Sequence, residues 1–330
     1  MKIGFRVDAN SIIGIGHLKR CLSLAVQIKK KKKKIKFFFL IKKTSNNYHF
    51  LIKKFSFNYF LLSKSISNFS ETISIIKKNK INMLIVDHYK INNTWEKKVK
   101  KNLKYLISID DLNRTHFSDY LFKQDLEKKK IRILKYCKIL SGKDFFILDH
   151  KYSNLKKKNI SENNIVFLIN FGSNDIKNLT CKILIFLLSK YSKNKFYIVV
   201  EKNFRFLKKL RKIKNKNKNI KIYKNLKTLA NITNRSDVCF GAGGIHNIER
   251  TSIGKLSFVI TTAKNQIINT KLLIKKKLII YLGSQNNFNL KLIKPEVMRK
   301  SFLERHRTKA INFIDTNGIK RVANILANLK

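Results

Sequence analysis

Short runs rich in Ile, Val and Phe alternate along the whole chain with longer amphipathic stretches, and this alternation restricts the fold more than any other feature. Strands separated by helical stretches are typical of βαβ units, whose strands pair in parallel. The predicted strands are residues 2–7, 36–41, 83–86, 105–109, 165–170, 196–200, 220–223, 238–240, 257–261 and 278–282. The sequence therefore predicts an α/β protein with two doubly wound, Rossmann-like domains.

The length fits two domains, because single hydrophobic cores stop growing at roughly 250 to 300 residues and this chain has 330, of which 44% are hydrophobic. Residues 151–164 are rich in Lys, Ser and Asn and interrupt the strand and helix pattern. We place the first domain at residues 1–156 and the second at residues 157–330. Ligands of open parallel sheets bind at the carboxyl ends of the strands, so a central cleft between the domains is the expected site.

The net charge of +54 invites a nucleic-acid function, because clustered basic residues neutralise phosphates. Here lysine occurs in nearly every segment, including the run 29–34, rather than in one patch. It also accompanies abundant Asn, Ile and Phe and only one Pro, as expected where A/T-rich codons are favoured. We therefore expect no specific nucleic-acid partner, and keep a basic polyanion-binding protein as the non-enzyme alternative.

The remaining composition predicts a cytoplasmic protein without a membrane span. No secretion signal precedes the first strand, and the longest apolar runs, such as 183–188, fall far short of the roughly 20 residues that cross a bilayer. The sequence indicates no oligomeric state. The cysteines form neither a CxxC pair nor a cluster with histidine, which fits reduced thiols; they are Cys21, Cys137, Cys181 and Cys239.

An acidic pair, Asp110 and Asp111, resembles half of a metal site, but only His116 and Asp119 accompany it nearby. We expect no metal and no other cofactor.

The loop after the first strand, residues 8–16, opens a helix that begins near His17. Gly14 and Gly16 allow backbone amides to approach an anion, and the helix N-terminus adds positive potential. An isolated motif of this kind is more simply a glycine turn with His17 as a polar cap.

A second glycine loop changes that balance. GAGG, residues 241–244, follows a strand and precedes a helix that carries Glu249. Its glycines can hold a diphosphate, and Glu249 can accept hydrogen bonds from a ribose diol, although an acid is also simply favoured near a helix N-terminus. Two anion-binding loops, one in each half, fit a nucleotide sugar better than two accidental turns.

Three further loops end strands and are candidates for the cleft: 87–89, 172–175 and 264–266. For Asp87 and His88 the alternative is a turn with local bonds between side chain and backbone. His246, beside GAGG, either touches phosphate or faces solvent.

A series of motifs runs from residue 1 to the closing NGIKRVANIL: FRVD (5–8), IGIGHLKR (13–20), VDHY (86–89), IDDLNRTH (109–116), LSGKDFFIL (140–148), FGSND (171–175), GAGG with Glu249 and Arg250, and KNQ (264–266). The order of these motifs resembles the UDP-2,4-diacetamido-2,4,6-trideoxy-β-L-altropyranose hydrolases of pseudaminic acid biosynthesis and the related spore-coat polysaccharide proteins. Family members often have Trp where Ile248 stands and Gly where Ser173 stands, which bears on substrate preference.

The resemblance implies a GT-B fold and metal-independent hydrolysis of a UDP-sugar at its anomeric carbon, in the route to pseudaminic acid or a related nonulosonic acid. It makes His17 the general base. The residues it implies for sugar binding are Arg6, Asp8, Tyr89, Asn265 and Gln266. The residues it implies for UDP binding are Gly14, Gly16, Gly172, Gly243, Gly244 and Glu249.

The chemistry of such a reaction suits these residues. A departing diphosphate spreads its charge and needs no strong acid, whereas the attacking water must lose a proton. Histidine, with an ordinary pKa of about 6.5, accepts protons near neutral pH. Attack opposite UDP inverts the anomeric centre. The main alternative is a GT-B glycosyltransferase, which shares the fold and the UDP loops but passes the sugar to an acceptor hydroxyl.

Overall fold

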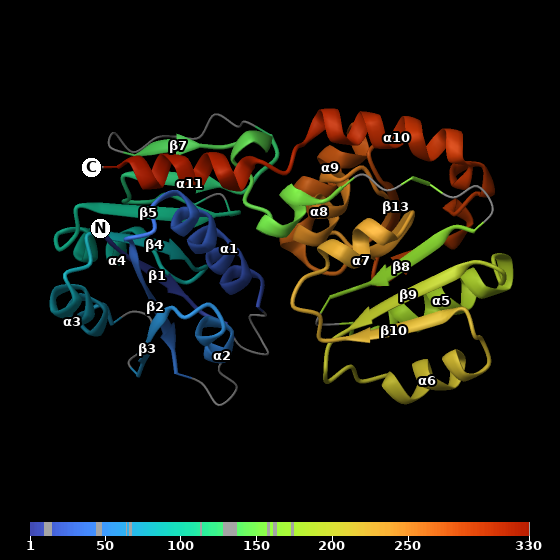
Figure 1. Ribbon diagram of the computed structural model, residues 1–330, viewed down its shortest axis with the longest axis horizontal. Helices are drawn as coiled ribbons and strands as arrows, with labels where there is room; N and C mark the ends of the chain where they lie inside the picture. Colours follow the sequence, from blue (N-terminus) through green and yellow to red (C-terminus); the bar gives the residue numbers. More distant parts are fainter. Residues whose placement is uncertain are drawn as a thin grey trace. The chain divides into compact units, whose positions relative to one another are not determined.

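The computed structural model describes residues 1–9, 15–43, 48–63, 65, 68–112, 114–127, 137–156, 159–160, 164–172 and 175–329. The chain divides into two compact units (Figure 1). The first comprises Met1–His150 and Asn317–Lys330, and the second is Lys151–Thr316.

The first unit contains a seven-stranded sheet with the order β3-β2-β1-β4-β5-β6-β7, in which every neighbouring pair is parallel. Its strands are β1 (Lys2–Val7), β2 (Lys36–Lys42), β3 (Asn58–Leu62), β4 (Met83–Asp87), β5 (Tyr105–Asp110), β6 (Tyr120–Lys123) and β7 (Lys138–Leu140). Its α-helices are α1 (Gly16–Lys31), α2 (His49–Lys53), α3 (Ser70–Asn79), α4 (Asn93–Lys100) and α11 (Gly318–Asn328), and its 3-10 helices are η1 (Lys143–Phe145) and, at the end of the unit, the start of η2 (His150–Asn154).

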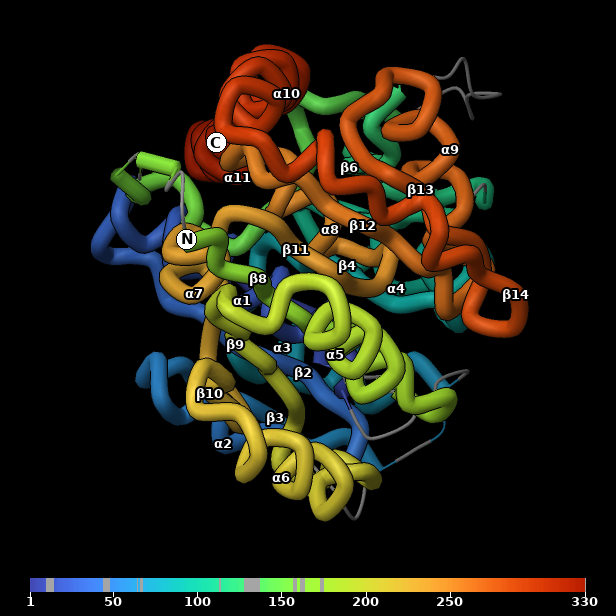
Figure 2. The backbone as a smooth tube through the Cα atoms, turned by 90° about the vertical axis from the view of Figure 1, so that its right-hand side faces the viewer, coloured from blue at the N-terminus to red at the C-terminus, as the bar shows by residue number. Residues whose placement is uncertain are grey.

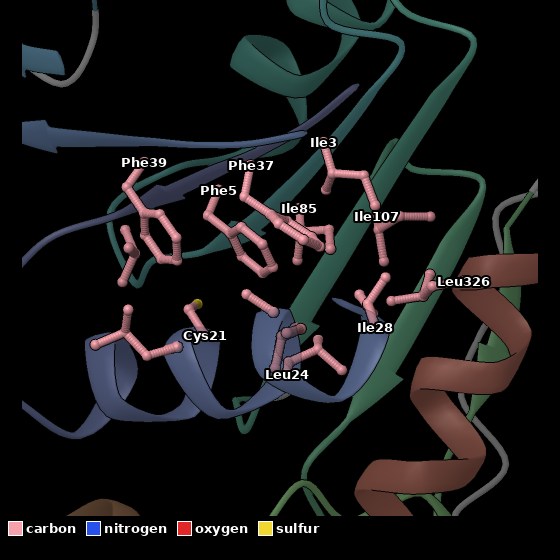
Figure 3. Close-up of a cluster of buried hydrophobic side chains, with 14 of the residues drawn as sticks. Ile3, Phe5, Cys21, Leu24, Ile28, Phe37, Phe39, Ile85, Ile107 and Leu326 are labelled. Carbon is pink, nitrogen blue, oxygen red and sulfur yellow. The ribbon is translucent and has the colours of Figure 1, made fainter. Parts of the chain in front are cut away.

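Helices cover both faces of this sheet. On one face α1 and α11 bury apolar side chains against alternate strand residues such as Phe5, Phe39 and Ile85. Figure 3 shows Leu24 and Ile28 of α1 and Leu326 of α11 directed toward that layer. On the other face α3 and α4 pack on the intervening residues, including Leu84 and Leu106. The short apolar runs that predict the strands are therefore buried on both faces, with alternate residues in two separate apolar layers.

The second unit contains a seven-stranded sheet with the order β10-β9-β8-β11-β12-β13-β14, parallel except for the last, antiparallel pair. Its strands are β8 (Val166–Asn170), β9 (Lys195–Val200), β10 (Ile220–Lys224), β11 (Val238–Ala242), β12 (Leu256–Thr261), β13 (Ile280–Ser284) and β14 (Asn287–Phe288). Its helices are α5 (Leu179–Lys190), α6 (Leu207–Asn215), α7 (Ala230–Arg235), α8 (Ile245–Ser252), α9 (Ile267–Lys275), α10 (Lys300–Phe313), η3 (Lys264–Gln266), η4 (Leu290–Leu292) and η5 (Pro295–Met298).

The second sheet is likewise covered on both faces. Helices α5 and α6 lie side by side (Figure 2) and pack on residues such as Phe167 and Phe196. Helix α7 buries Ile232 against the opposite face, beside Leu168. In the part of the chain that the structure describes, no helix is long and apolar enough to cross a membrane.

The division of the chain differs from the predicted boundary between residues 156 and 157. The first unit ends at His150, and the chain returns to it at Asn317. Helix α11 buries Ile319 and Val322 in the core of the first unit. The apolar periodicity of residues 318–328 indicates an amphipathic helix but not the sheet on which that helix packs, so the sequence assigned it to the neighbouring domain.

Four strands of the structure are not among the ten predicted ones: β3, β6, β7 and β14. Three of them, β3, β7 and β14, lie at the edges of the sheets, and β7 and β14 are only three and two residues long. Edge strands are exposed on one side, which shortens the apolar run that identifies a strand.

Candidate active site

His17 and Asp87 form the centre of a polar cluster at the carboxyl end of the first sheet. His17 lies in the first turn of α1, and Asp87 is the last residue of β4, which pairs in parallel with β1 so that Asp87 lies opposite Val7. The distance from His17 Nδ1 to Asp87 Oδ1 is 2.6 Å. Arg20, one turn further along α1, donates from Nε to Asp87 Oδ2 at 2.8 Å and from Nη2 to Asp87 Oδ1 at 2.6 Å.

This geometry sets the tautomer of His17. Nδ1 lies 2.6 Å from a carboxylate oxygen and 3.1 Å from Arg20 Nη2. A carboxylate can only accept and a guanidinium can only donate, so Nδ1 cannot satisfy both partners. The shorter, charge-assisted contact assigns the proton to Nδ1, with Asp87 as the acceptor. Nε2 then carries the lone pair and is available as a proton acceptor.

Asp87 stays ionised because of its partners. Burial alone would raise the pKa of this fully enclosed carboxyl, but Arg20 and His17 hold the pKa well below its ordinary range. Cys21 Sγ lies 3.6 Å from Asp87 Oδ2, and burial raises the pKa of that thiol. Cys21 therefore remains a neutral thiol beside the carboxylate.

Tyr89 stands next to His17, with ring centroids 4.5 Å apart and an interplanar angle of 89°. Its hydroxyl donates to Asp111 Oδ2 at 2.8 Å. Asp111 thereby has a role that the sequence did not assign.

Arg6 and Asp8, both predicted to bind the sugar, are buried and paired with each other. Asp8 also accepts from the amide of Lys42 at 2.8 Å and contacts His88 Nε2 at 3.0 Å. Burial would raise the pKa of Asp8, but His88 and Arg6 lower it well below its ordinary range. This cluster joins the carboxyl ends of β1, β2 and β4. Direct contact of Arg6 or Asp8 with a sugar stays a prediction.

Asp110 belongs to a second buried network. His116 lies between two carboxylates, with Nδ1 2.8 Å from Glu96 Oε1 and Nε2 3.2 Å from Asp110 Oδ2. Burial would lower the pKa of His116, but the hydrogen bonds to Asp110 and Glu96 raise it to about 9, so this histidine is a cation at neutral pH. Among the described residues, no group of three or more His, Cys, Asp or Glu side chains is arranged to hold a metal ion.

The GAGG loop lies at the carboxyl end of β11 and leads into α8. No side chain caps the helix, and no acidic residue stands in its first turn. Gln266 braces the loop, because its Oε1 accepts from the amides of Gly243 at 3.2 Å and Thr262 at 2.9 Å. A Cβ on Gly243 would lie 2.7 Å from Thr270 Oγ1, so this position has no room for a side chain.

Glu249 and His246 form a pair on α8, with Glu249 Oε2 2.6 Å from His246 Nδ1. Glu249 is buried, whereas the His246 side chain is about one-third exposed, at 34%. Contact of Glu249 with ribose stays a prediction. Ile248 is buried in the interior, so this departure from the family pattern affects packing rather than an exposed stacking surface.

The other predicted site residues are placed as follows. Gly16 opens α1, and a Cβ there would meet nothing within 4 Å. Gly172 has a φ of +79°, which favours glycine. Asn265 is exposed in η3, and Asp175 accepts from the first amides of α5. Gly14, Ser173 and Asn174 lie outside the described residues.

Sequence reasoning missed the partners that orient His17. For Asp87, the alternative of a purely local turn is wrong, because its carboxylate contacts Arg20 and His17, which lie 67 and 70 positions earlier in the chain. His88 makes both a local and a distant contact. Its Nδ1 accepts a hydrogen bond from the amide of Lys90, as a local turn predicts, while its Nε2 contacts Asp8, 80 positions earlier. A usable signal exists for Arg20, which lies three residues after His17 and therefore on the same helix face.

Two domains, each a largely parallel seven-stranded sheet covered by helices, define the GT-B class. Solved structures confirm this fold class. MurG of Acinetobacter baumannii superimposes with a TM-score of 0.70 at 12% identity, and UDP-GlcNAc 2-epimerase of Neisseria meningitidis bound to UDP-GlcNAc with 0.64 at 14% identity. Both alignments cover all of this chain and all of the other.

Two curated proteins are similar in sequence. The UDP-2,4-diacetamido-2,4,6-trideoxy-β-L-altropyranose hydrolase of Campylobacter jejuni is 29% identical over 243 residues, covering 72% of this chain and 83% of that protein. An uncharacterized protein of Methanocaldococcus jannaschii is 29% identical over 277 residues, covering 77% of this chain and only 54%, about half, of its own length. No protein-family model matches. The resemblance to the UDP-2,4-diacetamido-2,4,6-trideoxy-β-L-altropyranose hydrolase family is confirmed.

Proposed function

We propose that this protein is a hydrolase that releases UDP and a free sugar from a UDP-linked 2,4-diacetamido-2,4,6-trideoxyhexose, in pseudaminic acid or related nonulosonic acid biosynthesis. The observation that carries the proposal is the Arg20–Asp87–His17 arrangement, in which a buried carboxylate fixes one nitrogen of an imidazole at 2.6 Å and leaves the other as a base. The likeness to the Campylobacter hydrolase supports the substrate class.

In the proposed reaction, His17 Nε2 takes a proton from water while the water oxygen bonds to the anomeric carbon. The bond between that carbon and the β-phosphate oxygen breaks, and UDP leaves with the electron pair. Asp87 stabilises the imidazolium that forms and Arg20 keeps Asp87 charged and oriented, as a carboxylate does for a catalytic histidine in other hydrolases. Attack opposite the leaving group inverts the anomeric centre.

The leaving group requires stabilisation rather than protonation. We assign this to backbone amides of the two glycine loops, with Gly16 at the start of α1 and Gly243 and Gly244 before α8. Gln266 Oε1 accepts a hydrogen bond from the Gly243 amide, so bound diphosphate would compete with that hydrogen bond. No metal takes part in the proposed chemistry. That both domains face one substrate across a cleft stays a prediction.

The test is incubation of the purified protein with a panel of UDP-linked 2,4-diacetamido sugars and with UDP-GlcNAc, while UDP release is followed. We expect release from at least one 2,4-diacetamido sugar without an added acceptor or metal, and far less from UDP-GlcNAc. Release that begins only when an acceptor sugar or lipid is added would instead identify the protein as a glycosyltransferase. Absence of release under both conditions would remove the proposal.

A further inference from the structure

The segment that follows β5 holds the loop that carries Tyr89. Arg114 donates from Nη1 to the carbonyl oxygens of Tyr89 and of Ile91, the latter at 3.0 Å, and from Nη2 to that of His88 at 3.3 Å. One guanidinium thus ties down three carbonyls within four residues, and its side chain is only about one-quarter exposed, at 26%.

Asp110 fixes the position of the Arg114 guanidinium. Nη2 donates to Asp110 Oδ1 at 2.7 Å, and Nε to Asp110 Oδ2 at 3.3 Å. Asp110 in turn is fixed by His116, which Glu96 holds from the other side. These alternating charges are buried apart from the partly exposed Arg114 side chain, and the hydrogen bonds leave its guanidinium little freedom to rotate.

Asp111, the residue after Asp110, holds the hydroxyl end of the Tyr89 side chain. Asp111 Oδ2 accepts from the Tyr89 hydroxyl at 2.8 Å. The Tyr89 backbone and phenol are therefore both held from residues 110–114, while its ring meets His17 at a centroid distance of 4.5 Å.

We propose that Arg114 and Asp111 are positioning residues that set Tyr89 edge-to-face against the His17 ring, and so fix the orientation of the catalytic base. Arg114 sets the backbone of the loop and Asp111 sets the phenol. The inference rests on the proposed function for its effect on turnover, but the geometry of the His17 and Tyr89 rings does not depend on what the substrate is.

The experiment follows the His17 ring protons by NMR in the full chain with isotope-labelled histidine, assigned through His17→Gln. Because Tyr89 packs edge-to-face with His17, its ring current changes the chemical shifts of the His17 ring protons. Tyr89→Leu gives the chemical shifts without that ring current. We expect Arg114→Gln and Asp111→Leu to move the His17 resonances toward the Tyr89→Leu value. Asp111→Asn, which keeps an acceptor oxygen, should stay near wild type.

Arg321→Gln is the matched control, because Arg321 is also a partly buried arginine that donates to a carbonyl, that of Asp144 at 2.6 Å, in the same unit. It should leave the His17 resonances unchanged. With an accepted substrate, Arg114→Gln should lower kcat about 10- to 100-fold with KM within about twofold, as expected when a catalytic group is misplaced by a fraction of an ångström.

The two proposals fail in different ways. If Arg114→Gln folds but keeps the wild-type His17 resonances, the positioning role is overturned whatever the substrate. If the resonances move but wild-type protein releases no UDP from any sugar, the positioning role stands and the proposed function falls. If Arg114→Gln does not fold, the comparison of Asp111→Leu with Asp111→Asn tests whether this segment positions Tyr89. Wild-type His17 resonances in folded Asp111→Leu would then overturn the positioning role.

Discussion

His116 gives the first unit a stability that depends on pH. The side chain is buried between Asp110 and Glu96, and these carboxylates raise its pKa to about 9, whereas an unfolded chain returns it to about 6.5. A folded pKa above the unfolded one means that the folded state binds the proton more tightly. The contribution is therefore complete below about pH 6 and is lost as the pH rises through 9.

The size of the effect follows from the shift. Each pKa unit is about 1.4 kcal/mol, so the bound proton contributes about 3 kcal/mol below pH 6 and about half a kcal/mol at pH 9. Between pH 7 and pH 9 the loss is about 2 kcal/mol. In a unit of this size that is a fall of about 4 to 8 °C in Tm.

The assay compares thermal unfolding of wild type and His116→Gln from pH 6 to pH 9.5. Subtracting the variant from the wild type removes the titration of the many lysines, which both proteins share. We expect the difference in Tm to be large at pH 6 to 7 and to shrink toward pH 9. A difference that stays constant or grows with pH would refute the reasoning.

Three further predictions concern other parts of the molecule. Asp87→Asn should lower kcat by about 100-fold or more while KM changes little, because the amide no longer stabilises the His17 imidazolium; steady-state UDP release with wild-type kcat would contradict this. Gly241→Ala should lower Tm by several degrees, since its Cβ would lie 2.2 Å from the Asn170 carbonyl oxygen, whereas Gly244→Ala, whose nearest neighbour would be 3.7 Å away, should not. Glu249→Gln should weaken UDP binding about tenfold in calorimetry, and unchanged affinity in the folded variant would remove Glu249 from the UDP site.

The fold was largely predictable because short apolar runs that alternate with amphipathic stretches indicate parallel strands joined by helices. Both β1 and β4, which deliver Val7 and Asp87 to the same sheet end, were located from their Ile and Val runs. Helix α11 shows the limit of that approach, because its apolar face specifies that it packs on a core but not on which one.

The candidate site was predictable in part. His17 was a candidate because glycines mark a loop that ends in a helix, and Tyr89 because it follows a strand; their roles came from the family resemblance and stay predictions. The Asp87 and Arg20 partnership was not found, since it joins residues 67 positions apart through the β1–β4 pairing, which local pattern does not specify. Arg114 was missed for the same reason, as its acceptors lie 23 to 26 residues earlier on a neighbouring strand's loop.

The central claim, hydrolysis by water attack at the anomeric carbon, is tested most directly by running the reaction in oxygen-18 water and locating the label by mass spectrometry. We predict heavy oxygen in the released sugar and none in UDP, with His17→Asn binding substrate but turning over about 100- to 10,000-fold more slowly. Label in UDP would show attack at phosphorus instead, and undiminished turnover by His17→Asn would contradict the assignment of the base.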